Sequence, residues 1–306
     1  RHGGPEVDYT VNPSIGIPSI TGAEDSLEPV ANALPAWDCI AGNMVVSSLL
    51  AAERDRLRTG KGQNVEFALK DAAAAIVGHL GMIGEATISD EQRRKSGNSL
   101  YGAYGQDFEC CCGGRVIVIG LTLRQWRGLL KAMDKIDEIK KLEEELSVSL
   151  DDEGRRWIHR HEINNIFRPW FAKRKITEFE KGFNDLGLTW SQFRTMKEAI
   201  DEDDDTFADN PMFETQDFDG IGKYMVPRSP VEFSNHLAIS PEKPPKLGQH
   251  TEEILADIMG LGSGEIGVLD AKQVRALFAA AEKHFPEAVP ALAISIFTGM
   301  RQAELT

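Results

Sequence analysis

Hydrophobic positions in the first part of the chain change spacing several times. From Ile40 to Ala52, apolar side chains recur on one face of a helix, and the stop signal at 59–62 ends a predicted helix of about 18 residues. Residues 64–69 alternate as a short strand does, and residues 71–85 have the small-residue spacing of a closely packed helix. Strand, turn and helix therefore alternate, which favours an α/β fold.

Other regions follow different patterns. Residues 5–37 are rich in proline, glycine and serine, and they predict irregular chain with short strands rather than helix. After a polar linker at 89–98, strands are predicted at 101–108 and 116–119, and residues 123–190 are expected to be helical. The chain after Trp190 is expected to be mostly irregular.

Composition and charge narrow the function classes. The 306 residues have a hydrophobic share of 42% and a net charge of −14, which indicates a folded protein and disfavours nucleic acid and membrane surfaces as partners. Apolar stretches are too short to span a bilayer. Because the chain starts at Arg1 without a signal-peptide pattern, we expect a fragment.

The cysteines and acidic residues give no metal motif. Cys39 stands alone and Cys110, Cys111 and Cys112 are adjacent, which fits neither a spaced disulfide framework nor a metal knuckle, so a reducing cytoplasm is expected. The acidic run at 201–205 lacks the alternate spacing of a calcium loop and predicts a solvated loop. No metal site is predicted.

Asp38 precedes the first apolar helix and has two interpretations. Aspartate is a favoured helix N-cap, because its carboxylate accepts hydrogen bonds from the first free amides. The same position suits catalysis, because those amides and the helix dipole also stabilise an anionic carboxylate or an adjacent oxyanion. Composition and spacing leave both roles open.

A set of short motifs resembles family III CoA-transferases (the CaiB/BaiF type) over about residues 1–265. The motifs are Leu34–Asp38, Ala51–Arg54, Arg58–Val65, Gly97–Gly105, Thr122–Trp126, Asn210–Phe213 and Leu247–Thr251. The resemblance implies an incomplete Rossmann-like large domain with a smaller α+β domain. It implies these segments: the second half of the large domain at 1–89, the small domain at 90–190, a return segment at 191–266, and a helical C-terminal addition at 267–306.

The resemblance also implies a reaction. In this family the aspartate before the helix is the nucleophile, which corresponds to Asp38, and the motifs are most similar to the mesaconyl-CoA C1–C4 transferase branch. Coenzyme A would enter as part of an acyl-CoA thioester, without a permanently bound cofactor, and a homodimer is implied. Val7, Asp8 and Tyr101 are the candidate substrate or CoA contacts. Related racemases use a histidine where this chain has Val7, which disfavours racemisation.

The C-terminal residues 297–305 have a separate resemblance, to the first conserved box of tyrosine recombinases, in which Arg301 would be the phosphate-contacting arginine. The later boxes of such enzymes do not follow in this sequence, so the arginine would be vestigial. Three hypotheses therefore stand: a CoA-transferase, an inactive truncated or fused remnant of one, and a DNA recombinase, which conflicts with the acidic charge.

Overall fold

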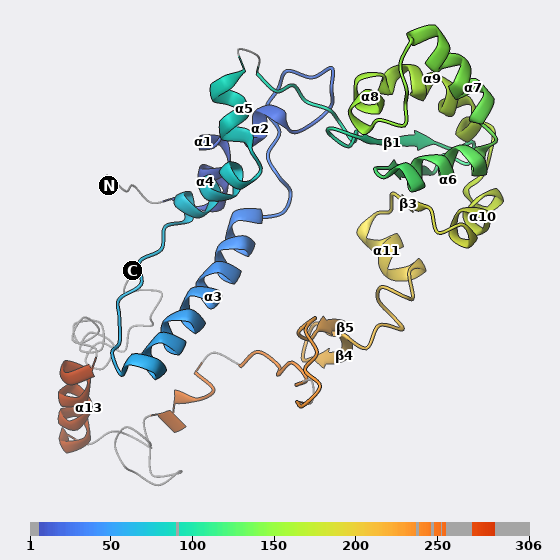
Figure 1. Cartoon of the computed structure of the whole chain (residues 1–306). Coiled ribbons are helices and arrows are strands. Elements are labelled where there is room, and N and C mark those ends of the chain that lie inside the picture. The colour runs from blue at the N-terminus through green and yellow to red at the C-terminus, as the bar shows by residue number, and fades with distance from the viewer. Residues whose placement is uncertain are drawn as a thin grey trace. The chain divides into compact units, whose positions relative to one another are not determined.

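The computed structural model describes residues 6–89, 92–236, 239–245, 248–251, 253–254 and 271–284 (Figure 1). The chain divides into two compact units, Arg1–Thr195 and Met196–Thr306. Within the described residues, no helix is both long and apolar enough to cross a membrane.

Helices alone make up the first part of unit 1. They are α1 (Asp8–Ser14), α2 (Ile17–Ile20), α3 (Ala36–Thr59), α4 (Leu69–His79) and α5 (Met82–Ile88). The prediction of irregular chain at 5–37 is wrong where α1 and α2 lie. Pro18 falls in the first turn of α2, where proline is tolerated because the first N–H groups have no intrahelical partner. Pro13 lies in the last turn of α1, which ends one residue later.

The long helix α3 confirms the predicted helix and begins four residues before Ile40, at Ala36. It ends at Gly60, whose φ of 71° is left-handed and whose N–H donates to the Arg56 carbonyl at 2.8 Å. Among its residues, all of which the structure describes, only Trp37 and Ala41 are buried. Most of α3 therefore lies at the surface.

The segment between α3 and α4 differs from the expected strand. Residues 61–68 are in neither helix nor strand, and none of the described strands pairs with them. A strand needs a hydrogen-bonded neighbour, so the alternating pattern at 64–69 is not sufficient by itself. The predicted helix at 71–85 is present but is divided into α4 and α5 at Gly81, where φ is 77°.

A sheet and five helices form the second part of unit 1. They are β1 (Tyr104–Glu109), β2 (Arg115–Gly120), β3 (Thr189–Gln192), α6 (Leu123–Met133), α7 (Ile136–Leu146), α8 (Glu153–Ile158), α9 (Arg160–Ala172) and α10 (Glu180–Asp185), with a 3-10 turn, η1 (Ile176–Glu178). The sheet is antiparallel in the order β1-β2-β3, with Tyr104 opposite Gly120 and Val118 opposite Trp190. The strands and helices expected here are confirmed, and β3 was not expected.

The core of this second part is strongly aromatic. Phe167 of α9 lies at the centre, with its ring centroid 5.5 Å from that of Tyr104 and 5.9 Å from that of Trp126. Phe171 stacks on Phe108 at 4.7 Å. Because such rings bury large apolar areas, the core contributes a large share of the stability of unit 1.

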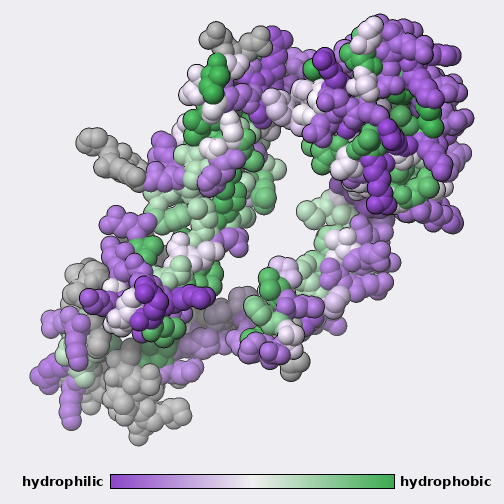
Figure 2. All heavy atoms as spheres, in the orientation of Figure 1, coloured by the Kyte–Doolittle hydropathy of each residue, from purple (hydrophilic) through white to green (hydrophobic). Residues whose placement is uncertain are grey.

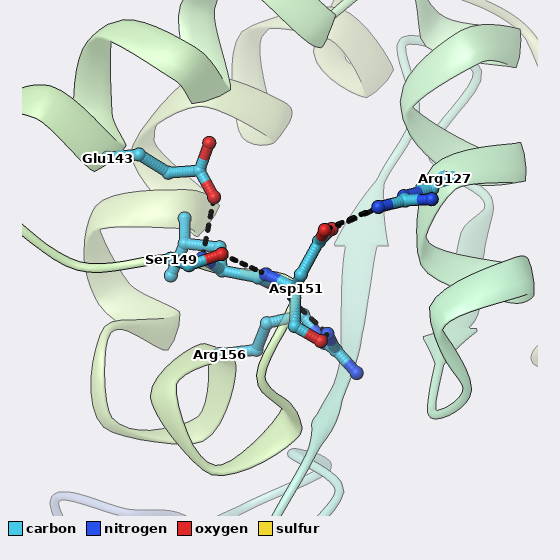
Figure 3. A network of polar contacts seen from close by, with 6 residues as sticks. Arg127, Glu143, Ser149, Asp151 and Arg156 are labelled. Atoms are coloured by element: carbon cyan, nitrogen blue, oxygen red, sulfur yellow. Dashed lines mark hydrogen bonds and ion pairs between the residues drawn. The ribbon is translucent and has the colours of Figure 1, made fainter.

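A buried arginine fastens the loop before α8 to this core. Arg156 is 1% exposed, and its guanidinium donates to the carbonyls of Leu150 at 2.8 Å, Asp151 at 2.9 Å and Leu121 at 2.8 Å. Figure 3 shows Arg156 below Asp151, with Glu143 on the other side of the loop. The Glu143 carboxylate accepts from the Leu150 N–H at 2.6 Å. Burial lowers the pKa of Arg156, while its three carbonyl partners satisfy most of its donors.

Between residues 196 and 227, unit 2 contains more regular structure than the sequence predicted, whereas its helix at 271–284 lies in the C-terminal segment that was expected to be helical. Its described elements are α11 (Met196–Glu202), β4 (Phe213–Phe218), β5 (Gly222–Pro227) and α13 (Ala271–His284). The two strands form an antiparallel hairpin with Phe218 opposite Gly222, so the expectation of mostly irregular chain after Trp190 is wrong here. An Asp219–Gly220 pair at the turn is the signal that could have identified it.

Candidate active site

Asp38 lies in the first turn of α3, as the third residue of the helix, and is exposed. The N-cap position is taken by Pro35, and no side chain at that position closes the helix end. The interpretation of Asp38 as the N-cap residue is therefore wrong. Its carboxylate is left at the positively polarised end of a long helix without being used to cap it.

The cap of α3 comes instead from Asp8. The buried Asp8 carboxylate, 2% exposed, accepts from the Trp37 N–H at 2.7 Å and, through the same oxygen, from the Asp38 N–H at 3.4 Å. Because Asp8 lies on α1, thirty residues earlier, the spacing around Asp38 gave no indication of it. Two aspartates therefore lie at the start of α3. Asp8 is buried and its carboxylate is hydrogen-bonded, whereas Asp38 is exposed.

A second contact fixes the residue next to Asp38. The Trp37 indole N–H donates to the Asn12 side-chain oxygen at 3.0 Å, and both residues are buried. Trp37 also packs in a small apolar cluster with Val11 of α1 and Val77 of α4. Since α1 holds both the backbone and the ring of Trp37, the start of α3 has little freedom to move.

The Asp38 carboxylate itself makes no hydrogen bond or ion pair with any residue that the structure describes. An exposed carboxylate without a hydrogen-bond partner is accessible for attack on an electrophilic carbonyl. Because the amides of Trp37 and Asp38 already donate to Asp8, the start of α3 could favour the developing oxyanion through its dipole rather than through free N–H groups. These properties suit a nucleophile, and no metal is required for such a step.

Val7 and Tyr101 lie in different surroundings. Val7 is the residue before α1 and is 57% exposed, directly beside the capping residue Asp8. Tyr101 is 49% exposed, and its hydroxyl donates to Glu85 at 3.3 Å while the Arg93 guanidinium lies 3.9 Å from its ring centre. The structure thus brings Asp8 and Asp38 together, while the contacts of Tyr101 join it to another cluster.

Glu85 and Arg93 were not identified from the sequence. Arg93 pairs with Glu85 through its Nε, at 3.0 Å from Oε1 and 3.1 Å from Oε2, and through a further ion pair from its terminal nitrogen. Hydrogen bonding to Arg93 holds the pKa of Glu85 below its ordinary value. Arg93 stands in a stretch that looked like a polar linker, so only the folded chain reveals the pair.

A cavity of about 580 Å³ opens beside this pair. Its walls are mainly aliphatic, and Glu85 and Arg93 provide its charged groups. The other lining residues are Ile15, Gly16, Ile17, Ser19, Ile20, Val77, Met82, Ile83, Ala86, Thr87, Ser89 and Gln92. Because Val77 also belongs to the cluster around Trp37, the cavity adjoins the packing that supports the start of α3.

Among the described residues, no three histidine, cysteine, aspartate or glutamate side chains converge as a metal site. Arg301 lies outside the described residues, so the resemblance to recombinases stays a prediction.

Comparison with curated proteins gives similarity along most of the chain. The chain is 46% identical over 269 residues to a 2-methylfumaryl-CoA isomerase of Chloroflexus aurantiacus, covering 88% of this chain and 66% of the relative. It is 24% identical to a succinyl-CoA:glutarate CoA-transferase of Mus musculus, over 82% of this chain and 55% of the relative. The chain thus spans between about half and two thirds of the length of these relatives.

Solved structures support the fold. A CAIB/BAIF family protein from Brucella suis matches with a TM-score of 0.63 at 21% identity, covering 84% of this chain and 65% of the other. A protein from Mycobacterium tuberculosis also matches with a TM-score of 0.63, at 20% identity, over 82% of this chain and 64% of the other. The predicted mixed helix and sheet fold of this family is confirmed.

The family model described as CoA-transferase family III matches residues 1–251, the part that contains Asp8, Asp38 and Tyr101. With that match and the 46% identical relative, the chain belongs to CoA-transferase family III.

Proposed function

We propose that this chain contributes the nucleophile of a CoA-transferase that moves CoA between the two carboxyl groups of 2-methylfumaryl-CoA (mesaconyl-CoA). The observation that carries the proposal is the exposed Asp38 carboxylate in the first turn of α3, beside a helix end that Asp8 already caps. The 46% identity to a 2-methylfumaryl-CoA isomerase supports the choice of substrate.

The proposed reaction begins at the thioester. The Asp38 carboxylate attacks the thioester carbonyl, the carbon–sulfur bond breaks, and CoA leaves as a thiolate, which gives a mixed anhydride. The thiolate then attacks the Asp38 carbonyl, so that an aspartyl-CoA thioester forms and the diacid is released as a carboxylate. Thiolate is a good leaving group, and the positive end of the α3 dipole would favour each tetrahedral oxyanion.

The second half reverses these steps on the other end of the diacid. Its second carboxylate attacks the aspartyl thioester, releases the thiolate and forms a new anhydride. The thiolate attacks the diacid carbonyl of that anhydride, which yields the isomeric thioester and regenerates the Asp38 carboxylate. CoA takes part only as a portion of the substrate, and no separate acceptor is needed.

The other site residues take supporting roles in this proposal. Asp8 acts through the position of α3, because its carboxylate is buried and occupied by the Trp37 and Asp38 amides. Val7 and Tyr101 are partly exposed and are proposed to contact the substrate or CoA. A homodimer, a cytoplasmic location and the domain boundaries at 89, 190 and 266 are proposed with the same family assignment.

The test is an incubation of the chain with 2-methylfumaryl-CoA. Chromatography would follow the isomeric thioester, and mass spectrometry would search for a covalent acyl or CoA adduct on Asp38. Asp38→Asn should abolish the adduct and lower turnover by a factor on the order of 10³ or more, as loss of a nucleophile does in other enzymes. Asp55→Asn, the same change later on α3, should leave both unchanged.

The remnant hypothesis makes the opposite prediction. A sample with the helical circular dichroism of the folded chain, but with neither adduct nor turnover, would contradict the proposed function and favour the remnant. Salt-sensitive binding of DNA by the same sample would instead support the recombinase hypothesis.

A further inference from the structure

A second cavity, of about 610 Å³, is lined by two segments that the proposed reaction does not use, residues 19–29 and 92–95. Next to the cavity, the Gly97 N–H donates to the Gly22 carbonyl at 3.1 Å and joins the two segments. Gly22 has a φ of 110°, and a Cβ atom placed on it would lie 2.8 Å from the Val30 side chain. The fold of the first segment therefore depends on a glycine at this position.

Lys95 is a buried cation in the wall of this cavity. The residue is 6% exposed, and its ammonium group donates to the backbone carbonyl of Glu28, which carries no charge. No carboxylate among the described residues forms an ion pair with Lys95. An ammonium group has three donors, and a buried charge is unfavourable unless an opposite charge lies near it. These two properties favour an anion in the cavity.

Arg94 and Ser26 add further donors to the same wall. Arg94 is exposed and makes no hydrogen bond or ion pair with any residue that the structure describes. The Ser26 hydroxyl oxygen accepts from the Glu28 N–H at 3.3 Å, so the hydrogen of this hydroxyl can be donated to a ligand. Donors from both segments thus line one cavity.

The other charged groups of the wall already have partners. The Glu24 carboxylate accepts from the Arg160 guanidinium of α9, and Arg93 is paired with the carboxylate described above. Because these charges are balanced, Arg94 and Lys95 give the wall an excess of positive charge. This excess is local, since the whole chain has a net charge of −14.

We propose that this cavity binds the diphosphate group of a nucleotide, with Lys95 and Arg94 as its cationic ligands and the Ser26 hydroxyl as a further donor. Lysine and arginine are the side chains that usually bind phosphate oxygens, and a diphosphate has enough negative charge to pair with both. The volume of about 610 Å³ lies within the usual range of small-molecule sites, so a nucleoside has room beside the diphosphate. Binding of a free nucleotide is independent of the proposed CoA transfer, whereas binding of the diphosphate of CoA would rest on it.

The experiment is isothermal titration calorimetry of the folded chain with ADP and with pyrophosphate at low ionic strength. Both should bind, and added sodium chloride should weaken the binding by screening. Arg94→Gln should raise the Kd about fivefold or more, because it removes one cation from the diphosphate. Arg54→Gln, at an exposed position on α3, makes the same change in net charge and should leave the Kd unchanged.

A change at Glu24 should act in the opposite direction. Glu24→Gln removes a carboxylate from the wall and releases Arg160, so it should lower the Kd about threefold or more. A residue that mattered only for folding would not raise the affinity when it is changed. Lys95→Met should reduce binding below detection in a sample whose circular dichroism is that of the folded chain. Arg94→Gln keeps the test decisive if Lys95→Met does not fold.

Titration with CoA separates the two sources of a diphosphate. Displacement of ADP by CoA would assign the diphosphate of CoA to this site as well, whereas ADP binding that CoA does not displace would assign the site to free nucleotides. Absence of binding by both ADP and pyrophosphate, or equal Kd values for the unaltered chain and Arg94→Gln, would overturn the proposal. So would weaker binding by Glu24→Gln. None of these results bears on Asp38, because its adduct with 2-methylfumaryl-CoA is measured separately.

Discussion

Two parts of unit 1 differ in the size of their hydrophobic cores. Around β1–β3, aromatic side chains such as Phe108, Phe167 and Phe171 fill a continuous core. Around α1–α4, the buried apolar cluster has one large side chain, Trp37, supported by the smaller Val11, Ala73 and Val77. In Figure 2 the surface of the β1–β3 part is mostly hydrophilic, whereas apolar groups are prominent over the part that contains α3–α5.

The candidate nucleophile and the main hydrophobic core lie in different parts of unit 1. Asp38, the proposed nucleophile, belongs to the weakly packed part, where polar contacts from Asp8 and Asn12 position the helix start. The strongly packed part contributes no candidate nucleophile to the proposed transfer. A substitution in the core around β1–β3 should therefore change the free energy of global unfolding. A substitution around α1–α4 should mainly change local order near Asp38.

Removal of the central ring of the aromatic core should have the largest effect on stability. Phe167→Ala deletes a fully buried side chain that contacts Tyr104 and Trp126, and we expect a loss of about 3–5 kcal/mol in the free energy of unfolding. Urea unfolding followed by tryptophan fluorescence measures it. Phe193→Ala, at a site 43% exposed, should change it by less than about 1 kcal/mol. Similar losses in the two variants would contradict the comparison.

Substitution of the buried Arg156 should cause the second-largest loss in the free energy of unfolding. Arg156→Met keeps much of the volume but leaves the carbonyls of Leu150 and Leu121 without their donor, so we expect a loss of about 2–3 kcal/mol. Differential scanning calorimetry measures it. The neighbouring Arg155 on α8 is exposed, and Arg155→Met is the matched control that should change little. A neutral result for Arg156→Met would show that packing alone holds the loop.

A smaller and more local effect is expected at the cap of α3. Asp8→Ala removes the acceptor for the Trp37 and Asp38 amides and should cost about 1 kcal/mol. Hydrogen exchange should increase at the first amides of α3 but not within β2. Asp8→Asn retains an oxygen acceptor and should cost less. Exchange that rises equally in both parts would mean that their packing is not independent.

The smallest effect concerns acid sensitivity at the Glu85–Arg93 pair. Arg93 lowers the pKa of Glu85, so the pair contributes stability above the unfolded-state pKa of about 4.3, and this contribution is lost as the pH falls through the lower folded-state pKa. Because the pair is partly exposed, the contribution should be under about 1 kcal/mol. Glu85→Gln should flatten the stability profile between about pH 5 and pH 3. Glu66→Gln, at an exposed position, should not.

The sequence predicted those features that depend on near neighbours. The helical face from Ile40 onward and the strand containing Val116 and Val118 were identified because periodicity reports burial within a single element. The cap of α3 was not, because its acceptor, Asp8, comes from another helix. The Glu85–Arg93 pair was missed for the same reason, since neither residue has a motif of its own.

The site was predicted only in part, and for a related reason. Asp38 was singled out by its neighbours and by the family resemblance, but its expected role as a cap belonged to Asp8. The strand predicted at 64–69 shows the opposite error, because a pattern can fit a strand when no partner strand is present among the described residues. Sequence patterns indicate which face of a helix or strand is apolar, whereas a site depends on contacts between different elements.

The exposed apolar side chains of α3 have a practical consequence for handling the protein. Val46, Leu49, Leu50 and Leu57 are all more than half exposed on this one helix. Such a surface promotes self-association, and a net charge of −14 opposes it by mutual repulsion between molecules. High salt weakens that repulsion, so ammonium sulfate or concentrated buffer should precipitate the chain readily. Low ionic strength and a pH well above the isoelectric point of about 5.0 are the conditions in which to purify and assay it.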